Sequence, residues 1–249
     1  MKANFIGPAG AARGPNDRVI VSAGIGEHYA PDFAATRARC NQHCSDVWRL
    51  YYDDYPDGCP PQIERQYAFK VFAIEQAIRA GFRYILWMDA AFAPIAAIDR
   101  LWETIASKGW YVPPQYAYTL GRWCSDAALE IFGIHRARAD TIPLVFTGLV
   151  GLDMQNPIGW AIWDWWERLY EAGAFDGPHF NRPGEPITPC GPVKLQGHAS
   201  DDPTVGGHRH DESSLSYVLH VLGLKPMMLN YLTLESKAGF IGHLVRLAN

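Results

Sequence analysis

Apolar residues follow two alternating patterns along the chain. Short uninterrupted apolar runs predict buried strands, and apolar residues spaced three or four positions apart predict the helices between them. The predicted strands cover residues 18–23, 47–52, 84–88 and 143–152, and the predicted helices cover residues 31–43, 63–80, 95–107, 158–172 and 211–222. Strands that alternate with helices predict an α/β fold, in which helices flank both faces of a mainly parallel central sheet.

Residues 175–207 interrupt this pattern. The segment is rich in Gly, Pro, His and Asp and has almost no apolar periodicity. Such a long stretch within a compact domain is usually functional or disordered, and we expect a long active-site loop here. The 249 residues fit one domain, in which residues 1–17 are expected to form a loose N-terminal segment.

Composition and charge exclude some classes of protein. The formal net charge of −4 argues against a protein whose main task is to hold nucleic acid by its phosphates. The apolar runs are shorter than the ~20 residues of a membrane span, and no signal-type apolar core follows the first residues, so we expect a cytoplasmic protein.

The five scattered cysteines predict reduced thiols. Cys40, His43 and Cys44 could form half of a zinc site, but no second pair of ligands stands at a suitable spacing.

Asp89 is the first candidate for chemistry, because it directly follows the predicted strand of residues 84–88. Ligands of parallel sheets lie beyond the carboxyl ends of the strands, where a carboxylate can hold a divalent cation against a pyrophosphate. An aspartate at this position could also simply cap the next turn or helix.

The segment Gly207-His208-Arg209-His210-Asp211-Glu212 gathers two imidazoles, a guanidinium and two carboxylates at the start of a predicted helix. Imidazole and carboxylate groups bind Mn²⁺ or Zn²⁺, and a carboxylate can act as a general base. The ordinary alternative is that Asp211 or Ser213 caps the helix while Glu212 favours its dipole.

Two further regions are weaker candidates for ligand binding. Lys70 could reach a phosphate and Tyr67 could stack on a base, although a solvated position for the lysine and a core contact for the tyrosine are the more ordinary interpretations. The turn Gly24-Ile25-Gly26 lacks the third glycine of a dinucleotide-binding fingerprint, because Tyr29 occupies that position.

Residues 83–91, Arg-Tyr-Ile-Leu-Trp-Met-Asp-Ala-Ala, resemble the strand and metal-binding motif of GT-A glycosyltransferases, in which an apolar run precedes Asp-x-Asp. Residues 207–213 resemble an "HRHDQS" segment of poorly characterised members of that superfamily. Residues 58–61, together with residues 67–70, resemble phage and environmental members, some of which are thought to glycosylate modified DNA bases. The resemblance extends in order over residues 19–224.

This resemblance implies a single-domain GT-A fold and a hexosyl transfer from a nucleotide-diphosphate sugar, such as a UDP-sugar, to an acceptor hydroxyl. The acceptor would be a saccharide or a hydroxymethylated base of phage DNA. The resemblance also implies a nucleotide site near the end of the first strand and a catalytic site in the His/Asp/Glu cluster, with Asp211 as the general base. The implied donor-site residues are Ala23, Gly24, Tyr67, Lys70, Asp89 and Ala91, and the implied catalytic residues are Asp211 and Glu212.

One departure from the family motif concerns the metal. Ala91 stands where the family has its second aspartate, so Asp89 would hold Mn²⁺ or Mg²⁺ with a ligand from elsewhere, or donor binding would be independent of metal. His208 and His210 are the candidates for the additional ligand.

Two other functions fit parts of the sequence. A metal-dependent hydrolase could be built on His198, His208, His210 and Asp211. A catalytically degenerate transferase that only binds sugars or partners would explain Ala91.

Overall fold

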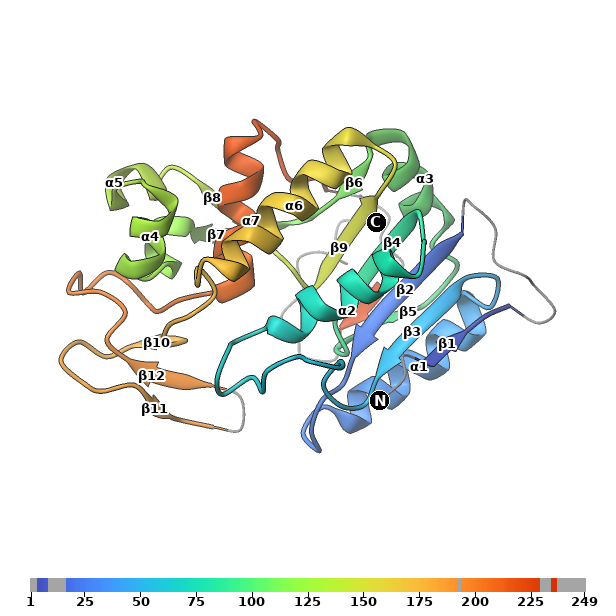
Figure 1. Cartoon of the computed structure of the whole chain (residues 1–249), viewed down its shortest axis with the longest axis horizontal. Helices are drawn as coiled ribbons and strands as arrows, with labels where there is room; N and C mark the ends of the chain where they lie inside the picture. Colours follow the sequence, from blue (N-terminus) through green and yellow to red (C-terminus); the bar gives the residue numbers. More distant parts are fainter. Residues whose placement is uncertain (1–3, 9–16, 192–193, 229–233, 237–249) are drawn as a thin grey trace.

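The computed structural model describes residues 4–8, 17–191, 194–228 and 234–236. Its centre is a six-stranded sheet with the order β1-β3-β2-β4-β9-β6 (Figure 1). The strands are β1 (Asn4–Ile6), β2 (Arg18–Ala23), β3 (Trp48–Tyr52), β4 (Tyr84–Met88), β6 (Trp110–Tyr111) and β9 (Leu149–Asp153).

The predicted α/β fold with a mainly parallel sheet is confirmed. Strand β2 is parallel to both β3 and β4, whereas β9 is antiparallel to β4 and to β6. Strand β1 is antiparallel to β3. Four strands therefore run in one direction, and only β1 and β9 run in the other.

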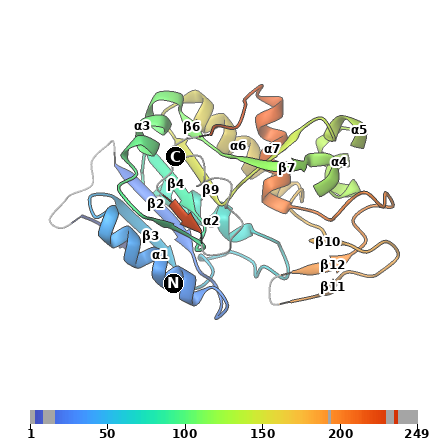
Figure 2. The same cartoon turned by 180° about the vertical axis from the view of Figure 1, so that it is seen from behind.

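Helices cover both faces of this sheet, as Figures 1 and 2 show from opposite sides. Helices α2, α6 and α7 contribute to one hydrophobic core, and α1 and α3 contribute to the other. Strand β4 serves both cores, because Ile85 and Trp87 face the first and Leu86 and Met88 face the second. These helices are α1 (Ala30–His43), α2 (Ala68–Arg79), α3 (Asp99–Lys108), α6 (Pro157–Glu171) and α7 (His210–Val221).

Smaller elements surround the central layers. Strands β5 (Phe92–Pro94) and β13 (Leu234–Ser236) form one antiparallel pair, and β7 (Pro114–Thr119) and β8 (Pro143–Val145) form another. A three-stranded sheet contains β10 (Phe180–Asn181), β12 (Leu195–Gly197) and β11 (Thr188–Pro189). The remaining helices are the 3₁₀-helix η1 (Leu120–Trp123), α4 (Asp126–Phe132) and α5 (Arg136–Ala139).

Two predicted helices begin later than the apolar spacing indicates. Helix α2 starts at Ala68 rather than at residue 63, because residues 62–66 form turns and Tyr67 adopts a left-handed backbone with φ of 57°. Ile63, predicted to lie on the buried face, is 48% exposed. Helix α3 starts at Asp99 rather than at residue 95, because Phe92–Pro94 extends as strand β5 before it.

The predicted strand of residues 143–152 is two strands that belong to different sheets. Strand β8 pairs with β7, and β9 lies between β4 and β6 in the central sheet. The residues between β8 and β9 form backbone hydrogen bonds with other segments. Phe146 N–H donates to Pro113 O, and Asp89 N–H donates to Gly148 O, each at 2.9 Å. The interruption places Thr147 beside the end of β4.

The segment of residues 175–207 is more ordered than predicted. It contains β10, β11 and β12, and the Asn181 side chain ties it together. The amide of Asn181 donates to Ser200 O at 3.0 Å and accepts from Ala199 N–H at 2.8 Å.

The N-terminal segment, predicted to be loose, contributes Asn4–Ile6 to the central sheet as β1. Residues 1–3 and 9–16 lie outside the described residues. No helix in the described ranges is long and apolar enough to cross a membrane.

Candidate functional site

Asp89 lies where β4 ends, at the carboxyl edge of the parallel strands. The indole Nε1–H of Trp87 donates to Asp89 Oδ1 at 2.7 Å, and a tight turn follows in which Phe92 N–H donates to Asp89 O at 2.9 Å. The Thr36 hydroxyl of α1 lies 2.7 Å from the carbonyl oxygens of both Ala90 and Phe92 and braces this turn. The Asp89 side chain stays 33% exposed, so it is fixed in position and still open to a ligand.

Lys70, in the first turn of α2, is the most unexpected member of the site. Its side chain is only 2% exposed, and its ammonium Nζ lies 3.1 Å from Asp89 Oδ1 and 2.7 Å from Asp211 Oδ2. Thr147 adds its carbonyl oxygen at 3.2 Å and its hydroxyl at 3.3 Å. Burial alone would lower the pKa of the Lys70 ammonium, but the charges of Asp211 and Asp89 raise it above its usual value. The ammonium is therefore permanently charged and surrounded by oxygen atoms.

The ordinary interpretation of Lys70 as a solvated residue is wrong. The Lys70 ammonium also has no free N–H group for the predicted contact with a donor phosphate. An ammonium has three N–H groups, and four oxygen acceptors already surround this one. The local sequence contains a signal for this burial, since Lys70 shares one face of α2 with the buried Ala73, Ile74 and Ala77.

Asp211, at the start of α7, lies on the other side of this ammonium. The Thr147 hydroxyl donates to Asp211 Oδ2 at 2.6 Å, and only 3% of the side chain is exposed. The Trp166 indole donates to the Asp211 carbonyl oxygen at 3.2 Å, which fixes the first turn of α7. The structure thus brings the end of β4 and the His/Asp/Glu segment together, with Lys70 between them.

Glu212 is adjacent in sequence but has different surroundings. It is half-buried and forms no ion pair with any residue that the structure describes. Burial and the negative charge of Asp211 raise the pKa of Glu212 to about 8, against the smaller opposing effect of Arg209 and Lys70. The side chain is therefore mostly protonated at neutral pH and becomes a base as the pH approaches 8.

Two aromatic residues begin the helices that meet here. Tyr67 (φ 57°) precedes α2, and His210 (φ 46°) is the first residue of α7. Their ring centroids are 5.2 Å apart with an interplanar angle of 31°. A left-handed backbone is unfavourable for such side chains and is found mostly where function or packing requires it. Tyr29 lies on the other side of the site, where burial and the charge of Asp89 raise the pKa of its hydroxyl.

The two histidines predicted as metal ligands form hydrogen bonds with the backbone, His208 through both ring nitrogens and His210 through Nδ1. Ser125 N–H donates to His208 Nδ1 at 3.3 Å, and His208 Nε2 lies 2.9 Å from the carbonyl oxygen of Ala174. His210 Nδ1 lies 2.8 Å from the carbonyl oxygen of Phe175. Burial is the main cause that lowers the pKa of each histidine to about 3, so both rings are neutral.

The predicted metal site of Asp89 with His208 and His210 is therefore not assembled. Among the described residues, no group of three or more His, Cys, Asp or Glu side chains is arranged to hold a metal ion. Both ring nitrogens of His208 are engaged, and Lys70 occupies the space between the carboxylates. The Mn²⁺ or Mg²⁺ that the resemblance implies does not fit these residues as they stand.

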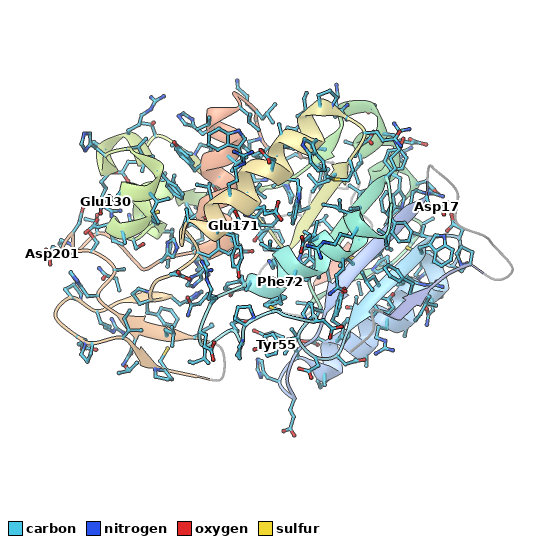
Figure 3. The ribbon with its side chains drawn as sticks, in the orientation of Figure 1. Asp17, Tyr55, Phe72, Glu130, Glu171 and Asp201 are labelled. Atoms are coloured by element: carbon cyan, nitrogen blue, oxygen red, sulfur yellow. The ribbon has the colours of Figure 1, made fainter. Side chains whose placement is uncertain are left out.

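The hydrolase centre proposed from sequence is not assembled either. His198 pairs with Asp201, at 2.9 Å, instead of joining His208, His210 and Asp211. Asp201 lies at the outer end of the molecule, beside α4 and well away from β4 (Figure 3).

The remaining donor-site predictions concern small residues near the ends of β2 and β4. Ala23 is the buried last residue of β2, and Gly24 follows it with its N–H bonded to Tyr52 O at 2.9 Å. A Cβ on Gly24 would lie 2.3 Å from Phe33 Cβ, so packing against α1 already requires glycine here. Ala91 is half-buried in the turn after Asp89 and packs against the core beneath α1.

Sequence reasoning missed Thr147, Trp87 and Tyr29. Thr147 lay within a run predicted to be one buried strand, and Trp87 counted only as an apolar strand residue. A hydroxyl inside an otherwise apolar run was the one available signal for Thr147, since a buried hydroxyl needs a hydrogen-bond partner.

No protein-family model matches this sequence, and no curated protein is significantly similar to it. Glycosyltransferases are among the solved structures that are similar to this chain. Mouse xyloside xylosyltransferase 1 is 8% identical, with a TM-score of 0.43 over 86% of each chain. The galactosyltransferase LgtC, solved with donor and acceptor sugar analogues, is 12% identical with a TM-score of 0.36, over 62% of this chain and 66% of that one.

A glycosyltransferase involved in glycosylation of the major capsid of PBCV-1 is 12% identical with a TM-score of 0.35, over 59% of this chain and 65% of that one. The chain thus spans slightly less than two thirds of the capsid glycosyltransferase and of LgtC. At this level of similarity, none of these proteins assigns a function.

Proposed function

We propose that the protein is a GT-A-type glycosyltransferase that moves a hexose from a nucleotide-diphosphate sugar to an acceptor hydroxyl. The observation that carries this proposal is the convergence of Asp89, Asp211 and Glu212 at the carboxyl edge of the parallel strands. Ligands of α/β sheets bind at this edge, and carboxylates there can position a sugar and accept a proton. The resemblance of residues 83–91 and 207–213 to this superfamily supports the same activity.

The donor is proposed to bind over the ends of β2 and β4. Ala23 and Gly24 would lie beneath the nucleoside of a UDP-sugar or a related donor, and Asp89 would contact the sugar diphosphate. Tyr67 and Tyr29 offer rings beside this position, both partly exposed. Lys70 would act on the donor only through Asp89, because its ammonium is already surrounded by oxygen atoms.

Glu212, rather than Asp211, is the better candidate for the general base. Asp211 is buried against Lys70 and Thr147, whereas Glu212 is partly exposed and has no ion pair with any described residue. In the proposed step, Glu212 takes the proton of the acceptor hydroxyl as the acceptor oxygen bonds to the anomeric carbon. The bond from that carbon to the phosphate oxygen breaks, and its electron pair leaves with the nucleoside diphosphate. Direct displacement of this kind inverts the sugar carbon.

The acceptor is proposed to be a saccharide, with a hydroxymethylated base of phage DNA as the second candidate. The segment of residues 175–207 would form the acceptor side, because it leads directly into α7. The net charge of −4 favours the saccharide, since duplex DNA is held mainly by basic surfaces.

Release of nucleoside diphosphate from a panel of nucleotide-sugars, with and without candidate acceptors, tests the proposal. Glu212→Gln should lower turnover about 10²–10⁴-fold while donor binding, measured by thermal shift, is retained. Glu75→Gln, an exchange of the same kind on the outer part of α2, is the matched control and should keep full activity.

Two results would count against the proposal. Full turnover by Glu212→Gln would remove Glu212 as the base. Donor binding by the wild type without any transfer or hydrolysis would instead indicate the degenerate sugar-binding protein.

A further inference from the structure

The geometry around Lys70 points to a built-in cation. We infer that the Lys70 ammonium takes the place of a divalent metal ion between Asp89 and Asp211, so that the site works without bound Mn²⁺ or Mg²⁺. The role of this ammonium in catalysis rests on the proposed transferase function. The binding measurements below do not depend on turnover.

The ligand set around the ammonium is the first argument. Two carboxylate oxygens, a carbonyl oxygen and a hydroxyl lie 2.7–3.3 Å from Lys70 Nζ. Carboxylates, carbonyls and hydroxyls are the oxygen ligands that hard divalent cations prefer. These four oxygen atoms therefore resemble the ligands of a cation site, and the Lys70 ammonium occupies the position of the cation.

Burial makes this arrangement permanent. Lys70 is 2% exposed and Asp211 is 3% exposed, so neither can turn outward to make room for an ion. The Thr147 hydroxyl, which donates to Asp211 Oδ2 at 2.6 Å, closes the same side of the cluster. Removing one partner of a buried ion pair leaves an uncompensated charge in a medium of low dielectric, which opposes any exchange of the ammonium for a metal.

The charge balance limits binding of a second cation. One ammonium and two carboxylates leave a formal net charge of −1 on these three side chains. Around the exposed part of Asp89, Ala91 supplies no carboxylate, and both ring nitrogens of His208 are bonded to the backbone. Asp211 is held by Lys70. Without substrate phosphates to complete the ligand set, one exposed carboxylate is a poor site for Mg²⁺ or Mn²⁺.

Lys70 is therefore a positioning residue rather than one that contacts the substrate. It joins α2, the end of β4, the segment between β8 and β9, and the start of α7 through one charged group. This contact sets where Asp89 meets the donor and where α7 presents Glu212.

Divalent-ion binding to the chelator-treated protein tests the inference, with thermal shift and Mn²⁺ paramagnetic resonance as readouts. The wild type should show no saturable Mn²⁺ site. Lys70→Ala removes the ammonium and opens space among the four oxygens, so this variant should gain one Mn²⁺ site. Its Tm should rise by about 5 °C or more when Mn²⁺ reaches 100 times the dissociation constant.

Two matched variants control for the loss of the lysine. Lys70→Met removes the charge but fills the space, so it should gain no ion site. Lys70→Ala combined with Asp89→Asn removes one of the carboxylates and should lose most of the gained affinity.

A folded Lys70→Ala variant that binds no Mn²⁺ would overturn the inference. So would a saturable Mn²⁺ site in the wild type that Asp89→Asn abolishes, and this second measurement remains decisive if Lys70→Ala does not fold. If transfer activity is found, chelation should leave it unchanged. If every nucleotide-sugar fails, the transferase proposal falls while the ion-binding result still stands.

Discussion

The first turns of α2 and α7 are similar in backbone and different in the charges they carry. Each helix has an aromatic residue with a left-handed backbone at its start, Tyr67 or His210, and the two rings lie against each other. Helix α2 then presents one cation, Lys70, and α7 presents two carboxylates, Asp211 and Glu212.

The difference separates two roles within the site. Lys70 and Asp211 stabilise the fold, whereas Glu212 is the residue that we propose as the base. Lys70 and Asp211 satisfy each other in the interior, so they fix the two helices relative to β4. Glu212 is left without an ion pair among the described residues, and its pKa of about 8 means that the ionised form, which can accept a proton, increases as the pH rises from 7 to 8. A buried ion pair therefore lies next to the carboxyl that we propose as the general base.

Removal of the cation from α2 should have the largest effect on stability. Lys70→Met leaves the buried Asp211 carboxylate without its cation and beside the like charge of Asp89, and it should lower the free energy of unfolding by about 3–5 kcal/mol. Urea denaturation measures this change. Arg79→Met on the same helix is the control, because the Arg79 side chain is 75% exposed and pairs with Glu75 on the same surface, and it should cost no more than about 1 kcal/mol. Equal losses for the two variants would contradict a structural role for the Lys70 pair.

Removal of the hydroxyl that joins the two helices should have a smaller effect. Thr147→Val keeps the shape but deletes the hydrogen bond to Asp211, and it should cost about 1–3 kcal/mol because the carboxylate loses a buried donor. Thr104→Val is the matched control, since that hydroxyl is exposed and bonds only within α3. A Thr147→Val variant as stable as the wild type would show that Lys70 alone satisfies Asp211.

The pH dependence of stability should reveal the raised pKa of Glu212. The folded-state pKa of Glu212 is about 8, against an ordinary value of 4.5, so the folded protein holds the proton more tightly than the unfolded chain does. Glu212 therefore disfavours the folded state increasingly as the pH rises from about 4.5 to 8, and no further above 8. Glu212→Gln removes this penalty.

The Tm of the Glu212→Gln variant should gain on that of the wild type across the same pH range and then stay level. Thermal melts at half-unit pH intervals measure the difference between the two proteins. A difference that does not change with pH would show that the Glu212 carboxyl is ionised already at low pH.

The sequence by itself determined the central strands and the place of Asp89. Residues 18–23, 47–52 and 84–88 are mostly apolar, and a strand that is buried on both faces can be recognised from its own residues. The start of α7 was equally readable, because the polar cluster gives way to apolar residues at helical spacing. A local sequence pattern is enough to predict an element when the element forms because its own residues are buried.

The tertiary structure alone decided which polar groups meet. Lys70 and Asp211 lie far apart in the sequence, and neither residue type shows by itself that the other will neutralise it in the interior. The same holds for His208, which binds backbone groups from two other segments instead of a metal. Pairing of buried polar groups depends on which segments the fold places side by side, and the low dielectric of the interior then requires every charge and hydrogen bond to be matched there.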